Sequence, residues 1–485
     1  MAARHGVHLI AYADRFGGSL AGLHDLLAGP LRGLFTGVHV LPFFTPYDGA
    51  DAGFDPVDHT AVDPRLGGWE DVRTLARDHA VTADLIVNHV SADSPEFRDV
   101  VARGAESELA GMFLTMSDVY PGGADERELT GIYRPRPGLP FTAVTLGGRR
   151  RLLWTTFTSR QIDLNLAHPA GRAYLARVLA ALAGGGVSMV RLDAVGYAVK
   201  TAGTSSFMTP ATFAFLDDLT AQARGLGMEV LVEVHSHVQR QVRIARQVDR
   251  VYDFALPPLL LHALSTGDAD ALRRWLAVRP RNAVTVLDTH DGIGVVDVGA
   301  DQIEPGSPGL LTPGEIEALV EGIHERSGGQ SRQATGWAAS NLDIYQVNCT
   351  YYDALGRDDD AYLMARAVQL FTPGIPQIYY VGLLAGQNDM DLLAATGVGR
   401  DINRHRYTAA EIEADLRRPV VGALLDLIRL RGSHPAFDGD VTLGGDGSRL
   451  VLGWRHGEHA ATLVADVATR RYEVTATAAT ATAGT

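Results

Sequence analysis

The sequence predicts an α/β fold, a closed (β/α)8 barrel of the TIM type with an inserted domain after strand 3, a second insertion after strand 7 and a small C-terminal β domain. Short apolar, β-rich runs alternate with longer segments of helical period, which is typical of a parallel sheet covered by helices. Eight such runs occur, and eight βα units favour a closed barrel over an open sheet. The chain has 485 residues, whereas a bare barrel needs only about 250, so additions must be present.

The predicted strands share branched aliphatic residues, and long connections separate them. They are Val7–Ala13, Gly37–Phe44, Ala83–His89, Ser188–Val195, Met228–His235, Arg250–Ala255, Ala283–His290 and Ile375–Val381. The helices predicted between them place their apolar residues on one face, as helices packed on a sheet do. Such helices are predicted over Glu70–His79, Gly171–Leu182, Pro210–Arg224 and Ala361–Phe371.

Three additions interrupt this alternation, so the barrel itself is expected over residues 1–89, 166–293 and 357–434. The inserted domain, residues 90–165, is rich in Gly, Pro, Arg and Thr and has a hairpin signal at Gly147-Gly148. The second insertion, residues 294–356, has one predicted helix (Pro313–Arg326) followed by a polar loop (Gly328–Asn341), and long loops at such positions usually shape a site.

The C-terminal β domain is expected over residues 435–485, with strands at Arg449–Trp454 and Ala460–Val464. The chain then ends in Ala/Thr repeats, Thr475–Thr485, which we expect to be frayed.

Composition limits the partners and the compartment. The formal net charge of −14 argues against a nucleic acid or an anionic membrane as partner, because both attract basic surfaces. Cys349 is the only cysteine, so no intrachain disulfide can form, which fits a reducing compartment. The sequence has no basic segment followed by an apolar one at its start, and no apolar run approaches the ~18 residues of a membrane span. We therefore expect a cytoplasmic protein with small-molecule substrates.

Reactive side chains follow four of the predicted strands. Strand 3 ends in Asn88-His89, strand 4 in Arg191-Leu-Asp193, strand 5 in Glu233-Val-His235, and strand 7 in His290-Asp291. The carboxyl ends of barrel strands meet at one mouth, so three carboxylates are expected to converge there. Paired carboxylates suit glycosidic bond cleavage, because one stabilises or attacks the cationic sugar carbon while the other protonates the leaving oxygen.

The residues around the carboxylates suggest separate roles. Arg191 points to the same face as Asp193, two residues on, and would lower the pKa of that carboxyl, as a nucleophile requires. Glu233 follows the apolar run Val230-Leu-Val, whose surroundings could raise its pKa toward the range of a general acid. Retention needs about 5–5.5 Å between the two carboxyl groups, which adjacent strand ends can supply.

Structural explanations compete with these roles. Asp193 could form only a buried ion pair with Arg191, Glu233 could cap the next helix, and Asp291 before Gly292 could be a turn residue. The hypothesis of a catalytic site would fail only if all three carboxylates had these structural roles at once.

Four other features have a simpler interpretation. His235 and His237 would bind a metal only with a third ligand, and no tight His/Cys cluster accompanies them, so no metal is expected. Gly184–Gly186 reads as a helix stop. Arg149–Arg151 reads as an exposed hairpin, with anion binding as the alternative. The aromatic residues after strand 2 belong either to the core or to a sugar-stacking platform, and the sequence leaves both open: Phe43, Phe44, Tyr47 and Phe54.

The ordered set Asp84, Asn88-His89, Arg191-Leu-Asp193, Glu233 and His290-Asp291 resembles the motifs of glycoside hydrolase family thirteen, the α-amylase family. Four further segments resemble the sucrose phosphorylase branch of that family. They are Tyr12–Arg15, Leu41–Asp55, Ile132–Pro140 and Gly399–His405. The likeness extends from about residue 7 to about residue 435.

The resemblance implies a hexosyltransferase that acts by double displacement and needs no cofactor. Asp193 would take the glucosyl group from sucrose, Glu233 would protonate fructose, and Asp291 would stabilise the transition state. Phosphate would then attack to give α-glucose 1-phosphate. The resemblance also suggests a homodimer.

The same resemblance implies a set of substrate-binding residues. Asp51, His89, Gln346 and Arg400 would hold the glucose hydroxyls, Phe54 and Phe157 would pack on the sugar, Tyr197 and His235 would border the leaving group, Arg136 and Tyr345 would receive phosphate, and Arg191, His290 and Asp343 complete the set.

Other activities stay open at this point. Relatives of the same branch use fructose 6-phosphate, glycerol or glycerate as acceptor, although Pro135, Asp343 and Tyr345 look more like the sucrose branch. A hydrolase or transglucosidase of the same fold would differ only in whether water or another alcohol, instead of phosphate, attacks in the second displacement. A sugar-binding barrel without activity should have lost a catalytic carboxylate, and all three are present here.

Overall fold

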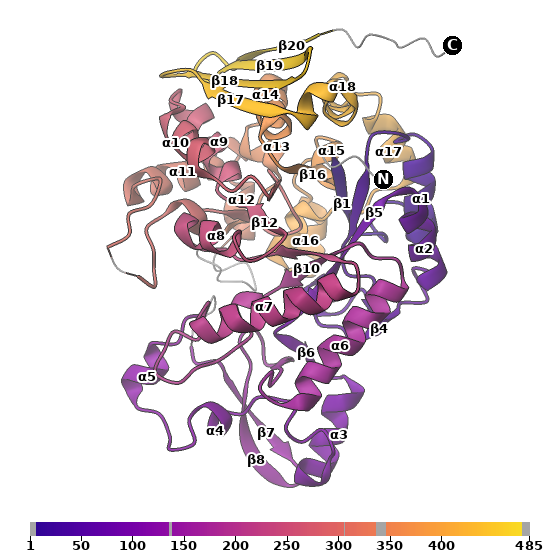
Figure 1. Ribbon diagram of the computed structural model, residues 1–485, viewed down its shortest axis with the longest axis vertical. Coiled ribbons are helices and arrows are strands. Elements are labelled where there is room, and N and C mark those ends of the chain that lie inside the picture. The colour runs from indigo at the N-terminus through magenta and orange to yellow at the C-terminus, as the bar shows by residue number, and fades with distance from the viewer. Residues whose placement is uncertain (1–5, 135–137, 305, 336–345, 478–485) are drawn as a thin grey trace.

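The computed structural model describes residues 6–134, 138–304, 306–335 and 346–477 (Figure 1). Its centre is a closed barrel of eight parallel strands. Around the ring they are β1 (His8–Ala11), β2 (Gly37–Val40), β5 (Ala80–Ile86), β10 (Met189–Asp193), β11 (Glu229–Val232), β12 (Arg250–Asp253), β13 (Ala283–Thr285) and β16 (Ile375–Tyr379). Each predicted run overlaps one of these strands, so the predicted barrel is confirmed.

Side chains fill the inside of the barrel. The Tyr252 hydroxyl on β12 donates a hydrogen bond to Gln377 Oε1 on β16 at 3.1 Å, and the Tyr252 ring lies in an apolar cluster. The other members of that cluster are Met189, Leu231, Phe254, Val284, Val286 and Ile375. Burial of an apolar side chain of this size stabilises the fold by about 1.5–3 kcal/mol. The strand ends therefore stand on a packed, rigid support.

The helices that cover the barrel include α2 (Trp69–Asp78), α6 (Pro169–Gly184), α7 (Pro210–Gly225) and α14 (Asp359–Phe371), each within a few residues of its predicted bounds. Helix α7 begins after Thr209, whose hydroxyl accepts the Thr212 amide at 3.3 Å, and Pro210 suits the first helical position because it has no amide to satisfy. Helix α6 ends at Gly184, and Gly186 has a φ of 84°, so the predicted glycine stop is confirmed.

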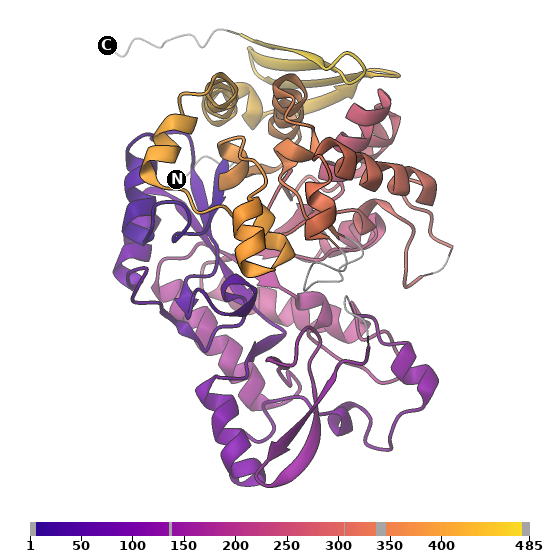
Figure 2. The ribbon, with the colours of Figure 1, turned by 180° about the vertical axis from the view of Figure 1, so that it is seen from behind.

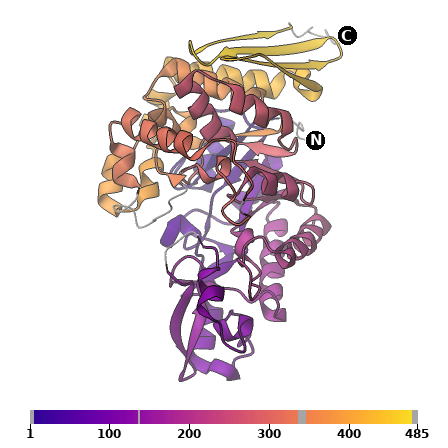
Figure 3. The same ribbon diagram turned by 90° about the vertical axis from the view of Figure 1, so that its left-hand side faces the viewer.

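A lobe inserted after β5 extends from one end of the barrel (Figures 1 and 3). It includes α3 (Pro95–Arg103), α4 (Met116–Val119), α5 (Glu126–Thr130) and the hairpin of β7 (Phe141–Leu146) and β8 (Arg149–Trp154). Its two ends meet where β6 (His89–Ser91) pairs antiparallel with β9 (Gln161–Asp163). The residues Arg149–Arg151 are exposed on β8, which fits the predicted hairpin.

Lys200 joins this lobe to the barrel. Its buried ammonium lies 2.6 Å from Asp163 Oδ2 on β9 and donates to Asn88 Oδ1, just beyond β5, at 2.5 Å. Burial lowers the pKa of Lys200, although Asp163 opposes that effect.

A second long connection follows β13. Its helix α11 (Pro313–Arg326) has the predicted bounds, and a capping box of Thr312 and Glu315 starts it. The polar stretch Gly328–Asn341, predicted as a loop, instead contains the short helix α12 (Gln330–Ala334), and residues 336–341 lie outside the described ranges. The connection returns through β15 (Gln346–Val347), which pairs antiparallel with β14 (Ile293–Gly294). After β16, helix α16 (Met390–Thr396) lies on the side of the molecule that faces the viewer in Figure 2.

A four-stranded antiparallel sheet closes the opposite end of the molecule from the inserted lobe (Figure 3). Its strands are β17 (Asp440–Gly444), β18 (Arg449–His456), β19 (His459–Asp466) and β20 (Arg471–Ala476). The Trp454 indole on β18 donates to Phe371 O of α14 at 2.7 Å and ties the sheet to the barrel. Strand β20 contains Thr475 and Ala476, so the predicted frayed tail begins too early, and residues 478–485 are not described.

Across the described part of the chain, no helix combines the length and the apolar character that crossing a membrane requires.

Candidate active site

The three predicted carboxylates meet in one pocket between the barrel mouth and the inserted lobe. Asp193 is the last residue of β10, Glu233 directly follows β11, and Asp291 lies in the loop after β13. Nine further predicted residues line the same pocket: Asp51, Phe54, His89, Phe157, Tyr197, His235, His290, Gln346 and Arg400. Arg191 contacts the pocket through Asp193. Arg136, Asp343 and Tyr345 lie outside the described residues.

Asp193 is held by a buried chain of charges. The Arg191 guanidinium donates to Asp193 Oδ1 at 2.9 Å and to Asp84 Oδ1 at 2.6 Å, and the other oxygen of Asp84 lies 3.0 Å from His39 Nε2. Asp84 thus holds the Arg191 guanidinium in place beside Asp193. Although burial opposes ionisation, His39 and Arg191 lower the pKa of Asp84 to about 2, so this support stays charged.

The prediction that the pKa of Asp193 is lowered is wrong, because its net shift is upward. Burial and the neighbouring carboxylate of Glu233 raise the pKa of Asp193, while Arg191 acts in the opposite direction. A carboxylate beside another carboxylate ionises less readily, because like charges repel. Arg191 is the feature that distinguishes them, since its guanidinium contacts Asp193.

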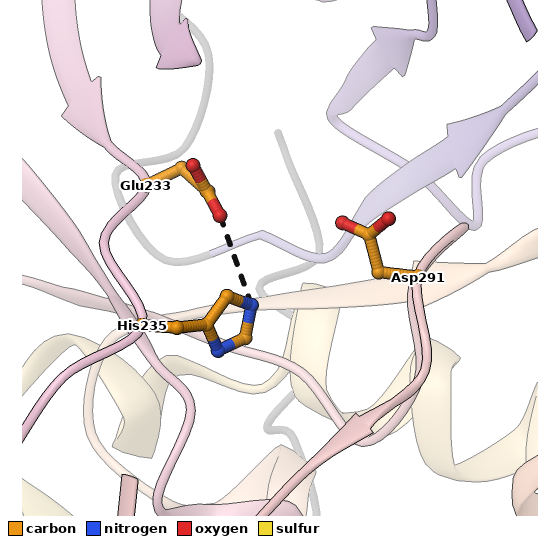
Figure 4. A group of neighbouring side chains, drawn as sticks. All are labelled: Glu233, His235 and Asp291. Atoms are coloured by element: carbon orange, nitrogen blue, oxygen red, sulfur yellow. Dashed lines mark ion pairs between the residues drawn. The ribbon is translucent and has the colours of Figure 1, made fainter. Parts of the chain in front are cut away.

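Glu233 is oriented by the backbone that follows Asp193. Ala194 has a left-handed φ of 54°, a strained conformation for a residue with a side chain, and its amide donates to Glu233 Oε2 at 3.3 Å. The other Glu233 oxygen lies 3.7 Å from His235 Nε2 (Figure 4). The predicted alternative that Glu233 caps the next helix does not hold, because His237 caps α8 (Val238–Ile244).

Asp291 is kept ionised by arginines. Arg400 Nη1 lies 2.9 Å from Asp291 Oδ1, and Arg404 Nη2 lies 4.0 Å away. Burial alone would raise the pKa of Asp291, but Arg400, with Arg191 and Arg404 among the smaller contributors, lowers it well below its usual value. Ionised Asp291 is thus favoured by its arginine neighbours, which a simple turn residue would not require.

Asp51 reaches the pocket from a strained loop. Three consecutive residues, Asp51, Ala52 and Gly53, have positive φ values of 53°, 52° and 89°. This turn brings Asp51 Oδ1 to 3.4 Å from Arg400 Nη1 and 3.8 Å from Arg404 Nη2. Local strain of this kind is retained where the surroundings fix it, often at functional sites.

Two of the three histidines that line the pocket, His290 and His235, have pKa values shifted in opposite directions. Burial, supported by Arg191 and Arg404, lowers the pKa of His290 to about 3, so its ring is neutral. Burial would also lower the pKa of His235, but Asp297, 2.8 Å from Nδ1, together with Glu233 and Asp291 raises it to about 9. His235 is therefore an imidazolium at neutral pH.

Aromatic rings form the walls. Phe54 stacks on His290 with centroids 4.8 Å apart and planes 9° apart, whereas Phe43 and Phe44 pack on each other in the core. Phe43 and Phe44 therefore belong to the core, whereas Phe54 lines the pocket. On the lobe side Phe157 contacts both His89 and Tyr197 edge to face.

Sequence reasoning missed other residues of the pocket. Tyr133, Gln161 and Phe207 line it, and Tyr133 stacks parallel to Tyr197 with centroids 6.3 Å apart. Tyr133 and Arg404 both lie inside segments that carry the family resemblance, so that signal could have found them. Phe207 has no such signal, because it lies on a loop between two left-handed residues, Ser206 and Met208.

The pocket also brings together three side chains of metal-binding type. One ligand atom each of Glu233, His235 and Asp291 lies within 4.8 Å of the others (Figure 4). A metal at this place would compete with the Arg400 guanidinium, which already neutralises Asp291, and with the charge of His235. His237, the other residue considered from the sequence, is not among the residues that line the pocket, and its Nε2 lies 3.0 Å from Pro308 O. The arrangement suits a transient cationic sugar better than a resident metal ion.

Comparisons with known proteins identify relatives of this chain. The model of the alpha amylase catalytic domain matches residues 13–243. A sucrose phosphorylase of Agrobacterium vitis is 58% identical over 98% of this chain and 97% of its own, and one of Bifidobacterium adolescentis is 54% identical over 95% and 92%. The crystal structure of a sucrose 6F-phosphate phosphorylase from Thermoanaerobacter thermosaccharolyticum superimposes with a TM-score of 0.89 at 37% identity, covering 98% of this chain and 96% of that one.

Proposed function

This chain belongs to the sucrose phosphorylase branch of the alpha-amylase family, and we propose that it transfers the glucosyl group of sucrose to inorganic phosphate, giving α-D-glucose 1-phosphate and D-fructose. The observation that carries the proposal is the convergence of Asp193, Glu233 and Asp291 in one pocket, each with different charged neighbours. The reaction is a glycosyl transfer that needs two carboxylates and no cofactor.

In the first step Asp193 attacks the anomeric carbon of the glucosyl unit while Glu233 donates its proton to the glycosidic oxygen. The carbon–oxygen bond to fructose breaks, fructose leaves as the alcohol, and glucose remains attached to Asp193 as an ester. Asp193 is the better placed of the two for the role of nucleophile, because Arg191 at 2.9 Å stabilises its ionised form.

In the second step a phosphate oxygen attacks the same carbon, the ester bond to Asp193 breaks, and Glu233 takes up the proton of the phosphate hydroxyl. Two displacements at one carbon retain its configuration, which accounts for an α product from an α substrate. Asp291 stabilises the positive charge that develops in both transition states, because Arg400 keeps it ionised without covering the pocket.

The glucose half of the pocket offers polar atoms for hydroxyl groups. Asp51, His89, His290, Gln346 and Arg400 are proposed to hold them, and Phe54 and Phe157 to pack on the sugar ring. Arg400 supports this assignment, because it contacts Asp51, Asp291 and Gln346 together and can align three acceptors.

The acceptor half is proposed to include Tyr197 and His235, with Arg136, Asp343 and Tyr345 from the two insertions. An exchange between Arg136 and Tyr345 would let one pocket receive fructose and phosphate in turn. The solved relative, at 37% identity, is named for sucrose 6F-phosphate, whereas identity to the two sucrose phosphorylases exceeds 50%, which favours sucrose.

The assay that tests the function follows α-glucose 1-phosphate and free glucose released from sucrose, with and without inorganic phosphate. We expect glucose 1-phosphate only with phosphate, and neither product from Asp193→Asn. Glucose alone would identify a hydrolase or transglucosidase. If the enzyme releases glucose 1-phosphate from a glucoside of fructose 6-phosphate, glycerol or glycerate, and not from sucrose, it is a phosphorylase with a different glucoside as substrate.

The domain division also remains a proposal: a barrel of residues 1–89, 166–293 and 357–434, an inserted domain of 90–165, a second insertion of 294–356 and a C-terminal domain of 435–485. The pairing of β6 with β9 and the sheet of β17–β20 support it. A cytoplasmic location and a homodimer stay predictions that fractionation and light scattering would test.

A further inference from the structure

Two adjacent side chains hold the backbone that leads to Asp291. The Asn403 side-chain amide donates to Thr289 O at 2.9 Å, and Arg404 Nε donates to His290 O at 2.8 Å. These two carbonyls are consecutive and directly precede Asp291. Asn403 and Arg404 are buried, and neither lines the pocket. The loop after β13 is therefore held at two successive peptide groups by residues that do not belong to the pocket wall.

The far end of the Arg404 side chain reaches two carboxylates of the glucose half. Its Nη2 lies 3.8 Å from Asp51 Oδ1 and 4.0 Å from Asp291 Oδ1. Arg400, which lines the pocket, brings its Nη1 to the same two oxygens, at 3.4 Å from Asp51 and 2.9 Å from Asp291. Two arginines thus converge on one pair of carboxylate oxygens, one of them from the pocket wall and the other from the buried side.

We propose that Asn403 and Arg404 are positioning residues that fix Asp51 and Asp291 against the glucosyl unit. Hydrogen bonds to the backbone set the place of Asp291, and the Arg404 guanidinium keeps the two carboxylates beside each other. The inference rests on the proposed function, in which Asp291 stabilises the cationic transition state and Asp51 holds a glucose hydroxyl. Because both displacements pass through such a transition state, the pair should matter equally for phosphorolysis and for hydrolysis.

Charge balance explains why two arginines are needed. Asp51 Oδ1 and Asp291 Oδ1 both lie within 3.4 Å of one nitrogen of Arg400, so the two carboxylates are close neighbours that repel each other when ionised. One guanidinium offsets one of these charges, and Arg404 offsets the other. With Arg404 removed, we expect the carboxylates to move apart or to take up a proton, and either change weakens the charge that Asp291 presents to the sugar.

Asp51 depends on an external contact because its own backbone is strained. Asp51 and Ala52 have φ values of 53° and 52°, in the left-handed region that residues with a side chain seldom adopt. Such a conformation persists only where the surroundings hold it. Arg400, which lies 349 positions later in the chain, and Arg404 provide that hold. The loop of Asp51 is therefore tied to the last part of the barrel.

The positioning pair is itself anchored to the barrel. The Tyr379 hydroxyl, at the end of β16, donates to Asn403 O at 2.9 Å, and Arg15 Nη1, in the loop after β1, donates to Arg404 O at 3.1 Å. Tyr379 and Arg15 are buried and, like the pair, do not line the pocket. The carbonyls of the pair thus bond to buried groups of the barrel, while its side chains bond to the loop before Asp291.

A purely structural role is the alternative, and it differs in where the loss appears. Contacts that only stabilise the fold lower the melting temperature and leave kcat of the folded enzyme nearly unchanged. A positioning role lowers kcat through Asp291, so the loss should disappear when the carboxylate of Asp291 has already been removed.

The test uses the full chain with three variants. Asn403→Ala removes one bond to the loop, Arg404→Lys removes the other and keeps the charge, and Arg404→Gln also removes the charge. Each is made alone and together with Asp291→Asn. Arg431→Lys and Arg431→Gln are matched controls, because Arg431 is a buried arginine that donates to Gly374 O at 3.0 Å beside the C-terminal sheet. Melting temperatures are measured together with kcat and KM for sucrose, both for phosphorolysis and for hydrolysis without phosphate.

We expect kcat to fall about 3- to 10-fold in Asn403→Ala and Arg404→Lys, the loss of one hydrogen bond, and about 10- to 100-fold in Arg404→Gln, which also loses the charge. Phosphorolysis and hydrolysis should fall equally. In Asn403→Ala, which keeps the contact of Arg404 with Asp51, KM for sucrose should change less than about 3-fold. In the Asp291→Asn background, Asn403→Ala and Arg404→Lys should each cost less than about 2-fold.

Losses that multiply with the loss in Asp291→Asn would overturn the inference. So would a kcat within about 2-fold of the wild type in Arg404→Gln, or losses of the same size in the Arg431 controls. If Arg404→Gln does not fold, Asn403→Ala and Arg404→Lys, which keep the charge, decide by the same cycle. A wild type that releases no glucose 1-phosphate from sucrose would count against the proposed function alone, and the cycle is then measured with the glucoside that it does cleave.

Discussion

Replacing Lys200 by methionine removes the buried cation that joins the inserted lobe to the barrel. Asp163, which is fully buried, would lose the ammonium at 2.6 Å and keep only its bonds from Thr156. Breaking a buried pair by removing one partner typically costs about 3–5 kcal/mol, because an uncompensated charge remains. With an unfolding entropy of roughly 2.1 cal/mol/K per residue, or about 1 kcal/mol/K for 485 residues, the melting temperature should fall by about 3 to 5 °C.

Differential scanning calorimetry of the single and double variants measures this loss. Lys200→Met combined with Asp163→Asn removes both charges, and we expect most of the lost stability to return, since the depressed pKa of Lys200 indicates that burial of its charge is only partly compensated. A single variant that melts like the wild type would refute the claim that the pair supports the lobe. A double variant as unstable as the single one would refute the explanation by an unpaired charge.

Three further predictions concern activity and pH. Asp291→Asn should lower kcat/KM for sucrose by at least about 10³-fold, because it removes a charge aimed at the cationic sugar, and a loss below 10-fold would contradict that role. His8, His59 and His290 are buried, and burial lowers their pKa values to about 4, about 4 and about 3. Each therefore stabilises the fold fully above pH 6.5 and progressively less as the pH falls toward 4, so thermal melts should show acid lability that His59→Gln reduces. Arg136→Ala should slow phosphorolysis far more than hydrolysis, and an equal loss of both would exclude a special part in binding phosphate.

The barrel could be predicted because each strand end carries its own local signal. Val230-Leu-Val before Glu233 and Arg191-Leu before Asp193 are apolar or alternating runs of strand length, and reactive residues stand at their carboxyl ends. A barrel collects those ends at one mouth whatever the connections between them, so three carboxylates could be grouped without knowledge of any contact.

Residues positioned by loops could not be found in the same way. Phe207 enters the pocket through two left-handed residues, Ser206 and Met208, and no periodicity signals such a turn. Asp297 contacts His235, which lies 62 positions earlier in the sequence. Its immediate neighbours are Val296 and Val298, and they give no sign of that contact. The net rise in the pKa of Asp193 also escaped prediction, because burial is a property of the assembled pocket and not of the Arg191-Leu-Asp193 motif.

A pocket that first binds a neutral sugar and then an anion has to separate two electrostatic demands. On the donor side a neutral His290 can form hydrogen bonds without adding a cation beside the positively charged sugar carbon, and Arg191 and Arg404 help to keep it neutral. On the proposed acceptor side burial would lower the pKa of His235, but Asp297, Glu233 and Asp291 raise it to about 9. The two rings are the same residue type in one pocket, so the difference comes from the Nδ1 contact, which is Asp297 for His235, whereas His290 Nδ1 has no hydrogen-bond partner among the described residues. A buried carboxylate outside the pocket lining thus accounts for much of the difference between the pKa values of the two rings.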